Sequence, residues 1–184
     1  GFCEPLVMRI ADRGAAAAAA DCDLLVLCYP TYYLQPPPSM REFAERRGPF
    51  DPPRKAFILT TCELYSENSI RRFALGLRER GVMAVGGAVI RAPGSDLTCV
   101  VPSALVPWWY RFERRFPDKL RAVAEEIRAC AGAADIRESI PPPRWYTPFT
   151  QLLQALVLNR FDGWRSRLLV LGDRCTLCGA CVAG

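Results

Sequence analysis

The sequence predicts an α/β fold built on a doubly wound parallel sheet. Two apolar runs of strand length, LLVLC at residues 24–28 and AFILTT at 56–61, show no polar alternation. Such runs are typical of strands that helices cover on both faces. Segments with helical periodicity alternate with these strands along the chain, which favours parallel strands joined by right-handed crossovers.

The expected elements follow from apolar runs, periodicity and chain breakers. We expect strands at residues 5–11, 24–28, 56–61 and 82–90. Helices are expected as one alanine-rich turn at 15–20 and as longer segments at 39–47, from Ser66 or Ser69 to Arg80, and at 118–130. The two longest helices each place apolar residues at i, i+3, i+4 and i+7: Ile70, Phe73, Ala74 and Leu77, then Leu120, Val123, Ala124 and Ile127.

The charge pattern argues against several classes of partner. The net charge of +5 comes almost entirely from arginines interleaved with glutamates, a pattern typical of solvated helix faces. The chain contains neither a basic block nor a motif for reading nucleic acid, so we expect no nucleic-acid partner. An acidic redox partner protein is a better match for the surplus of positive charge.

Hydropathy and cysteine use predict a cytoplasmic protein. No apolar run reaches the roughly 18 residues of a membrane span, and no basic and apolar leader opens the sequence. Nine cysteines without a secretory signal indicate a reducing compartment. The chain has no histidine, which excludes Ser-His-Asp and Cys-His catalysis and histidine metal sites within it.

A cysteine run near residue 184 carries the strongest chemical signal. Cys175, Cys178 and Cys181 form a C-x2-C-x2-C motif, with Gly179 easing the turn. Thiolates at this spacing can bind three irons of a 4Fe-4S cluster, while the fourth iron needs a ligand from elsewhere. A structural zinc site is the alternative. The motif predicts a metal centre, with an iron-sulfur cluster favoured.

Composition divides the chain into four parts. Residues 1–131 hold the α/β pattern, and 132–148 are a proline-rich linker containing Pro141, Pro142 and Pro143. Residues 149–166 form an apolar helix that we expect to dock on the first domain, and 167–184 begin a cysteine-rich domain.

Taken together, these features resemble a flavodoxin-like domain fused to a C-terminal 4Fe-4S ferredoxin-type domain, present as a fragment cut at both ends. The resemblance rests on DLLVLCYPTYYLQPP, RKAFILTT, SENSIRRFALGLRERG and the cysteine run. It implies an FMN site at the strand ends, 4Fe-4S clusters in the appended domain, and a role in electron transfer.

The resemblance also assigns residues. The family's loop beside the flavin ring is matched by Pro30, Thr31, Tyr32 and Tyr33. The end of the family's next flavin-contacting strand is matched by Thr60 and Thr61. Cys175, Cys178 and Cys181 match cluster ligands.

The chain departs from this family at two places. Cys62 and Glu63 stand where family members commonly have glycines, and a carboxylate there would oppose the negative charge of a reduced flavin. No Ser/Thr/Gly-rich phosphate loop is present. We therefore expect the fragment to begin at the second flavodoxin strand. Because the first strand is central in such a sheet, residues 5–11 should be poorly anchored.

The sequence thus favours a protein that relays electrons between FMN and 4Fe-4S clusters. Such a protein would be an electron carrier or an oxidoreductase component rather than a stand-alone enzyme. One alternative is a flavin-dependent iron-sulfur oxidoreductase that acts on a small substrate. The other is a non-redox module with a structural zinc site.

Overall fold

The computed structural model describes residues 6–9, 19, 22–31, 35–45, 49–62, 66, 68–92, 105, 115–133, 137–143, 145–153 and 155–156. The chain divides into two compact units, residues 1–144 and 145–184.

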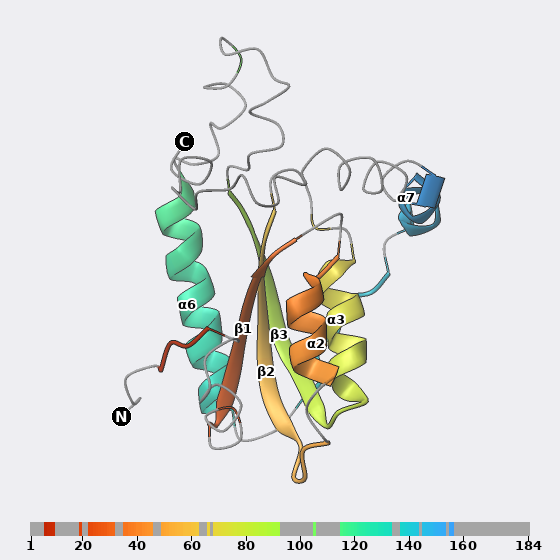
Figure 1. Cartoon of the computed structure of the whole chain (residues 1–184). Helices are drawn as coiled ribbons and strands as arrows, with labels where there is room; N and C mark the ends of the chain where they lie inside the picture. The colour runs from red at the N-terminus through yellow and green to blue at the C-terminus, as the bar shows by residue number, and fades with distance from the viewer. Residues whose placement is uncertain are drawn as a thin grey trace, which may run out of the picture. The chain divides into compact units, whose positions relative to one another are not determined.

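The first unit is built on a parallel sheet, shown in Figure 1. Among the described residues it has three strands in the order β1-β2-β3: β1 (Leu24–Pro30), β2 (Arg54–Cys62) and β3 (Val82–Arg91). β1 pairs with β2 from Leu24 opposite Lys55 onward, and β2 pairs with β3 from Arg54 opposite Val82. The predicted strands at 24–28, 56–61 and 82–90 and their parallel pairing are confirmed.

Helices cover both faces of this sheet. α2 (Pro38–Glu45) and α3 (Ser69–Arg78) lie on one face and α6 (Phe116–Gly132) lies on the other (Figure 1). After α3 the chain turns at Gly81, whose φ of 71° is a conformation that glycine adopts without strain. The α/β class and these three helices are therefore confirmed.

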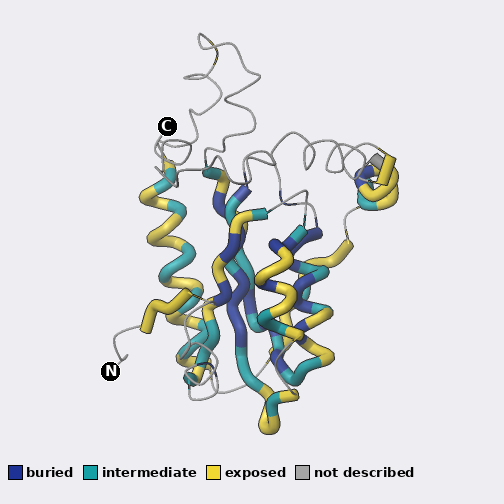
Figure 2. The backbone as a smooth tube through the Cα atoms, viewed as in Figure 1, coloured by how far each residue is buried: buried dark blue, intermediate teal, exposed yellow. Residues whose placement is uncertain are grey.

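The main core lies between the sheet and the α2/α3 layer. Its buried side chains come from all three strands and both helices, and they include Leu27, Tyr29, Ile58, Phe73 and Leu77. The Tyr29 and Phe73 rings meet edge to face with centroids 5.3 Å apart. Figure 2 shows the buried residues gathered in the strands and on the inner side of α3.

The opposite face is covered less completely, which corrects one prediction. Continuous apolarity predicted that β1 is buried on both faces, yet Val26 is 40% exposed and Cys28 is also exposed. Leu27 and Tyr29, which point the other way, are buried. The physical reason is that α6 packs mainly along β3 and only weakly on β1.

The prediction of a strand at residues 5–11 is wrong for the residues of this segment that the structure describes. Residues 6–9 have no regular structure, and Leu6 and Val7 are 75% and 88% exposed. Without sheet partners, an apolar run of this length gains too little burial to hold a strand. The expectation that this segment is poorly anchored agrees with the exposure. In the alanine-rich turn at 15–20, the structure describes Ala19, which is helical and buried.

α3 begins at Ser69, one of the two starts expected from the sequence. Asn68 occupies the N-cap position, and no side chain caps the helix there. Ser69 is buried and donates its hydroxyl hydrogen to the Tyr29 phenol oxygen. Its side chain therefore links the helix to β1.

Two glycines let β3 pack closely against both layers. A Cβ atom on Gly86 would lie 2.7 Å from the Phe57 ring, and one on Gly87 would lie 3.0 Å from the Ile70 side chain. β3 continues as one strand through both glycines, with a register shift in its pairing with β2 just before Gly86.

The second unit contains α7 (Thr147–Leu153). Phe149, Leu152 and Leu156 are 70%, 56% and 57% exposed. This is the apolar stripe of the helix predicted at 149–166, and its docking on the first unit stays a prediction. No helix in the described part of the chain is both long enough and apolar enough to cross a membrane.

Candidate functional site

The carboxyl ends of the three strands meet at one edge of the sheet. The Thr31 backbone N–H donates to the Thr61 carbonyl oxygen at 2.8 Å, which extends the pairing of β1 with β2 by one residue beyond Pro30. The Ala92 N–H donates to the Cys62 carbonyl oxygen at 3.0 Å and extends the pairing of β2 with β3 in the same way. These backbone bonds fix where each following loop begins.

Thr60 connects the ends of β1 and β2 through hydrogen bonds of its buried side chain. It is fully buried, and its hydroxyl donates to the Tyr29 carbonyl oxygen at 3.0 Å. The Thr31 hydroxyl lies 2.8 Å from the Thr60 hydroxyl. Since one hydroxyl has one hydrogen to donate, Thr60 accepts from Thr31 when it donates to Tyr29. The geometry gives Thr60 the role of positioning Thr31, and its own side chain offers no free surface to a ligand.

Tyr29 connects the same edge to α3. Its ring is buried, and the Ser69 hydroxyl donates to its phenol oxygen at 3.2 Å. Burial raises the pKa of Tyr29 to about 12, and the hydrogen bond from Ser69 lowers it in part. The phenol is therefore neutral at physiological pH and serves as a fixed polar link between the strand and the helix.

The residues predicted to lie near a flavin fall into two groups. Thr31 and Thr61 are half-buried and adjacent at the edge, Pro30 is exposed beside them, and Thr60 lies beneath them. Cys62 is buried, so it does not present its side chain at the surface. Tyr32, Tyr33 and Glu63 lie outside the described residues.

At the strand ends, the described residues line a hollow that is much smaller than a flavin. A small hollow of about 50 Å³ opens between the start of α3 and the end of β3, where it is lined by Ser66, Ile70 and Val89 among others. Pockets for molecules of cofactor size have volumes of about 300–1,000 Å³. The residues that follow the three strands, 32–34, 63–65 and 93–104, lie outside the described residues.

Sequence reasoning missed a larger hollow between α2 and α3. It measures about 360 Å³ and is floored in part by Phe73 and Gly76. Side chains of both charges line it: Arg41, Glu45, Arg72, Glu79 and Arg80. The one sequence signal was Gly76 inside a helical pattern, because an interior glycine weakens a helix and can mark a place where the surface is hollowed. A Cβ atom at Gly76 would meet nothing within 4 Å.

The predicted metal ligands lie elsewhere. Cys175, Cys178 and Cys181 are outside the described residues, as is all of the predicted domain at 167–184. Within the described ranges, no group of three or more cysteine, aspartate or glutamate side chains could hold a metal ion. The metal centre thus remains a prediction from the cysteine spacing.

Comparison of the chain with models of protein families gave no match, and comparison with curated proteins gave none either.

Proposed function

We propose that this chain is part of an electron-transfer protein. In this proposal Cys175, Cys178 and Cys181 bind a 4Fe-4S cluster, and the carboxyl edge of the sheet binds the flavin of FMN. The observation that carries the proposal is the C-x2-C-x2-C run in one chain with a parallel α/β unit. A thiolate-bound cluster supplies one-electron chemistry, with a potential set by burial and by hydrogen bonds to sulfur.

The chain's own residues have limited tasks in this proposal. Thr31 and Thr61 would lie against the flavin ring, because they are the half-buried side chains at the strand ends. Thr60 would hold Thr31 in place through the hydroxyl pair described above. Tyr32 and Tyr33 follow Thr31 directly in the sequence and would offer flat faces for stacking. The parallel order β1-β2-β3 supports the proposal, because the third, fourth and fifth strands of a flavodoxin-like sheet are also consecutive neighbours.

The cluster is tested by anaerobic reconstitution of the chain with iron and sulfide. We expect brown protein with bound iron and acid-labile sulfide, and an EPR signal on reduction. Cys178→Ala should lose at least half of the bound iron, because a cluster with two protein thiolates is poorly held. Cys130→Ala, which removes an isolated thiol of α6, is the matched control and should keep it. Colourless protein with one zinc and no sulfide would contradict the cluster and favour the zinc module.

The flavin is tested separately by titrating FMN while its fluorescence is monitored. Quenching that saturates, and that Tyr32→Ala or Tyr33→Ala weakens by about tenfold or more, would support stacking at this loop. Tyr146→Ala alters a tyrosine of the second unit and should leave the titration unchanged. If no variant changes the quenching, the flavin part of the proposal fails while the cluster part is untouched.

A further inference from the structure

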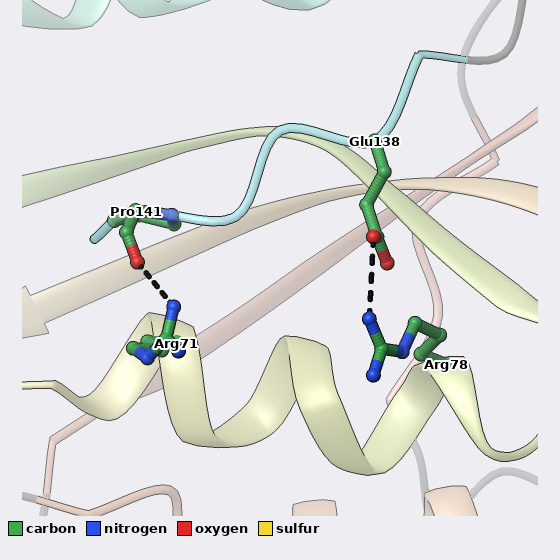
Figure 3. A network of polar contacts seen from close by, with 4 residues as sticks. All are labelled: Arg71, Arg78, Glu138 and Pro141. Atoms are coloured by element: carbon green, nitrogen blue, oxygen red, sulfur yellow. Dashed lines mark hydrogen bonds and ion pairs between the residues drawn. The ribbon is translucent and has the colours of Figure 1, made fainter. Parts of the chain in front are cut away.

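Residues 137–143 have no regular secondary structure and run past α3 and β3, and we call this segment the strap. The sequence predicted a proline-rich linker at 132–148, and the structure shows that the strap within it contacts the first unit. Figure 3 shows the strap running past α3, with side chains of the helix reaching toward it. Four contacts hold it, and they differ in kind.

The first two contacts attach the middle of the strap. The Ser139 backbone N–H donates to the Ala84 carbonyl oxygen at 2.7 Å, so the strap bonds to β3. The next residue, Ile140, is half-buried and packs against the main hydrophobic core. A backbone hydrogen bond and an adjacent apolar anchor fix both the position and the direction of the chain at this point.

The other two contacts come from α3. The Arg71 guanidinium donates to the Pro141 carbonyl oxygen at 2.9 Å, and the Arg78 guanidinium lies 3.6 Å from the Glu138 carboxylate. Arg71 and Arg78 are about two helical turns apart (Figure 3), and their partners Pro141 and Glu138 flank Ile140 in the sequence. The Arg71 contact is exposed to water, and in the ion pair the Arg78 and Glu138 side chains are 58% and 26% accessible, so each contact is expected to be weak.

The strap is therefore attached by far fewer interactions than the sheet. Its residues are exposed except for Ile140, and one described backbone N–H of the strap is bonded to the rest of the unit. Segments with few buried apolar contacts open locally at a lower free energy than the core. By contrast, β2 is paired along both of its edges and contains several fully buried residues.

We propose that the strap is a two-state element that opens without unfolding the sheet. In the closed state the four contacts hold it on α3 and β3. In the open state Ile140 leaves the core and Ser139 leaves Ala84, and these residues become free chain ahead of the second unit, which begins at residue 145. Seven residues of free chain span up to about 23 Å. The strap therefore controls how long a tether precedes the second unit, and this holds whether or not the proposed cofactors bind.

Amide hydrogen exchange of the whole chain tests this proposal at single residues. Ser139 reports strap opening, because its N–H is bonded only when the strap is closed. Ile58, fully buried in β2, reports opening of the sheet. In the native chain we expect Ser139 to exchange about 100-fold more slowly than in a free peptide, and at least about 100-fold faster than Ile58.

Three variants separate the contacts. Ile140→Ser removes the apolar anchor and should speed Ser139 exchange by about tenfold or more, with a smaller change at Ile58. Arg71→Gln should speed Ser139 exchange by about threefold. This variant alters an exposed contact, so it should fold normally and still test the strap if Ile140→Ser folds poorly. Leu120→Ser changes an exposed residue of α6 and is the control, for which no change at Ser139 is expected.

Two results would overturn the proposal. Ser139 exchange at the rate of a free peptide in the native chain would mean that the strap is not closed in solution. Equal exchange rates for Ser139 and Ile58, in the native chain and in both strap variants, would mean that the strap leaves only when the whole sheet unfolds.

Discussion

The two faces of the sheet are made from the same strands but are covered to different degrees. On the α2/α3 face, side chains such as Leu27, Ile58 and Phe73 are at most 6% exposed. On the α6 face, Val26 is 40% exposed and every residue of α6 is at least partly accessible to water. The difference teaches that an apolar strand sequence sets which residues can be buried, while the placement of helices decides which are.

Neighbouring residues of β1 give the sharpest test of this difference. Leu27→Ala should lower the free energy of unfolding by about 2–5 kcal/mol, because it leaves a cavity in the main core. Val26→Ala, one residue away on the other face, should cost about 1 kcal/mol. Urea unfolding followed by circular dichroism measures both. Equal losses would show that the α6 face is as well packed in solution as the other.

Substitution of Gly86 tests how closely α6 packs against β3. A Cβ atom there would lie 2.7 Å from the Phe57 ring and 3.2 Å from the Cys130 sulfur, so Gly86→Ala should cost about 1–3 kcal/mol. Gly76→Ala is the control, because a Cβ atom there meets nothing, and it should stabilise the chain by about 0.5–1 kcal/mol. Thermal unfolding compares the two. A neutral Gly86→Ala would mean that α6 sits farther from β3 than described.

Tyr29 tests the polar link on the better-covered face. Tyr29→Phe removes the hydroxyl that accepts from Ser69 and should cost about 1–2 kcal/mol at pH 7. Folding raises the pKa of this phenol from 10.0 to about 12. The neutral form is therefore favoured in the folded chain, and the resulting stabilisation is complete below pH 10 and is lost as the pH rises through 12.

Unfolding at several pH values measures that dependence. Between pH 10 and pH 12 the native chain should lose on the order of 2 kcal/mol relative to Tyr29→Phe, so the difference in unfolding free energy between the two chains should close or reverse. Other alkaline groups are common to both chains and cancel in the difference. A gap that stays constant would show that the Tyr29 phenol titrates normally in the folded chain.

Substitution of Lys55, on the α6 face, should have the smallest effect on stability of these variants. Its ammonium group donates to the carbonyl oxygens of Ala131 and Ala133 at 3.4 and 3.0 Å, at the end of α6. Lys55→Met should cost about 0.5–1 kcal/mol, because those carbonyls lose a positively charged donor. Lys119→Met, near the start of the same helix, is the matched control. A shift in melting temperature for Lys55→Met that is no larger than for Lys119→Met would argue against this contact.

Much of the fold could be predicted from local sequence. The apolar runs at 24–28 and 56–61 and the helical spacing of Ile70, Phe73 and Leu77 act within one element, and the structure contains each element. The exposure of Val26 could not be predicted, because it depends on where α6 crosses the sheet.

The candidate site shows the same limit. Pro30, Thr31 and Thr61 could be placed at the strand ends from the sequence, because each follows or ends an apolar run. The buried position of Thr60 and its bond to Tyr29 depend on strand register, which local patterns do not fix. The ligand role of the cysteine run stays a prediction, since it lies outside the described residues.

The strap also bears on how copies of this protein behave in concentrated solution. An uncovered strand edge invites pairing with another chain, and the outer edge of β3 is occupied at Ala84 by Ser139. Pro141, Pro142 and Pro143 then follow, and these residues have no N–H with which to add further strand pairing. Solubility on storage should therefore depend on these few residues, and variants that detach them should aggregate sooner than variants of equal stability elsewhere.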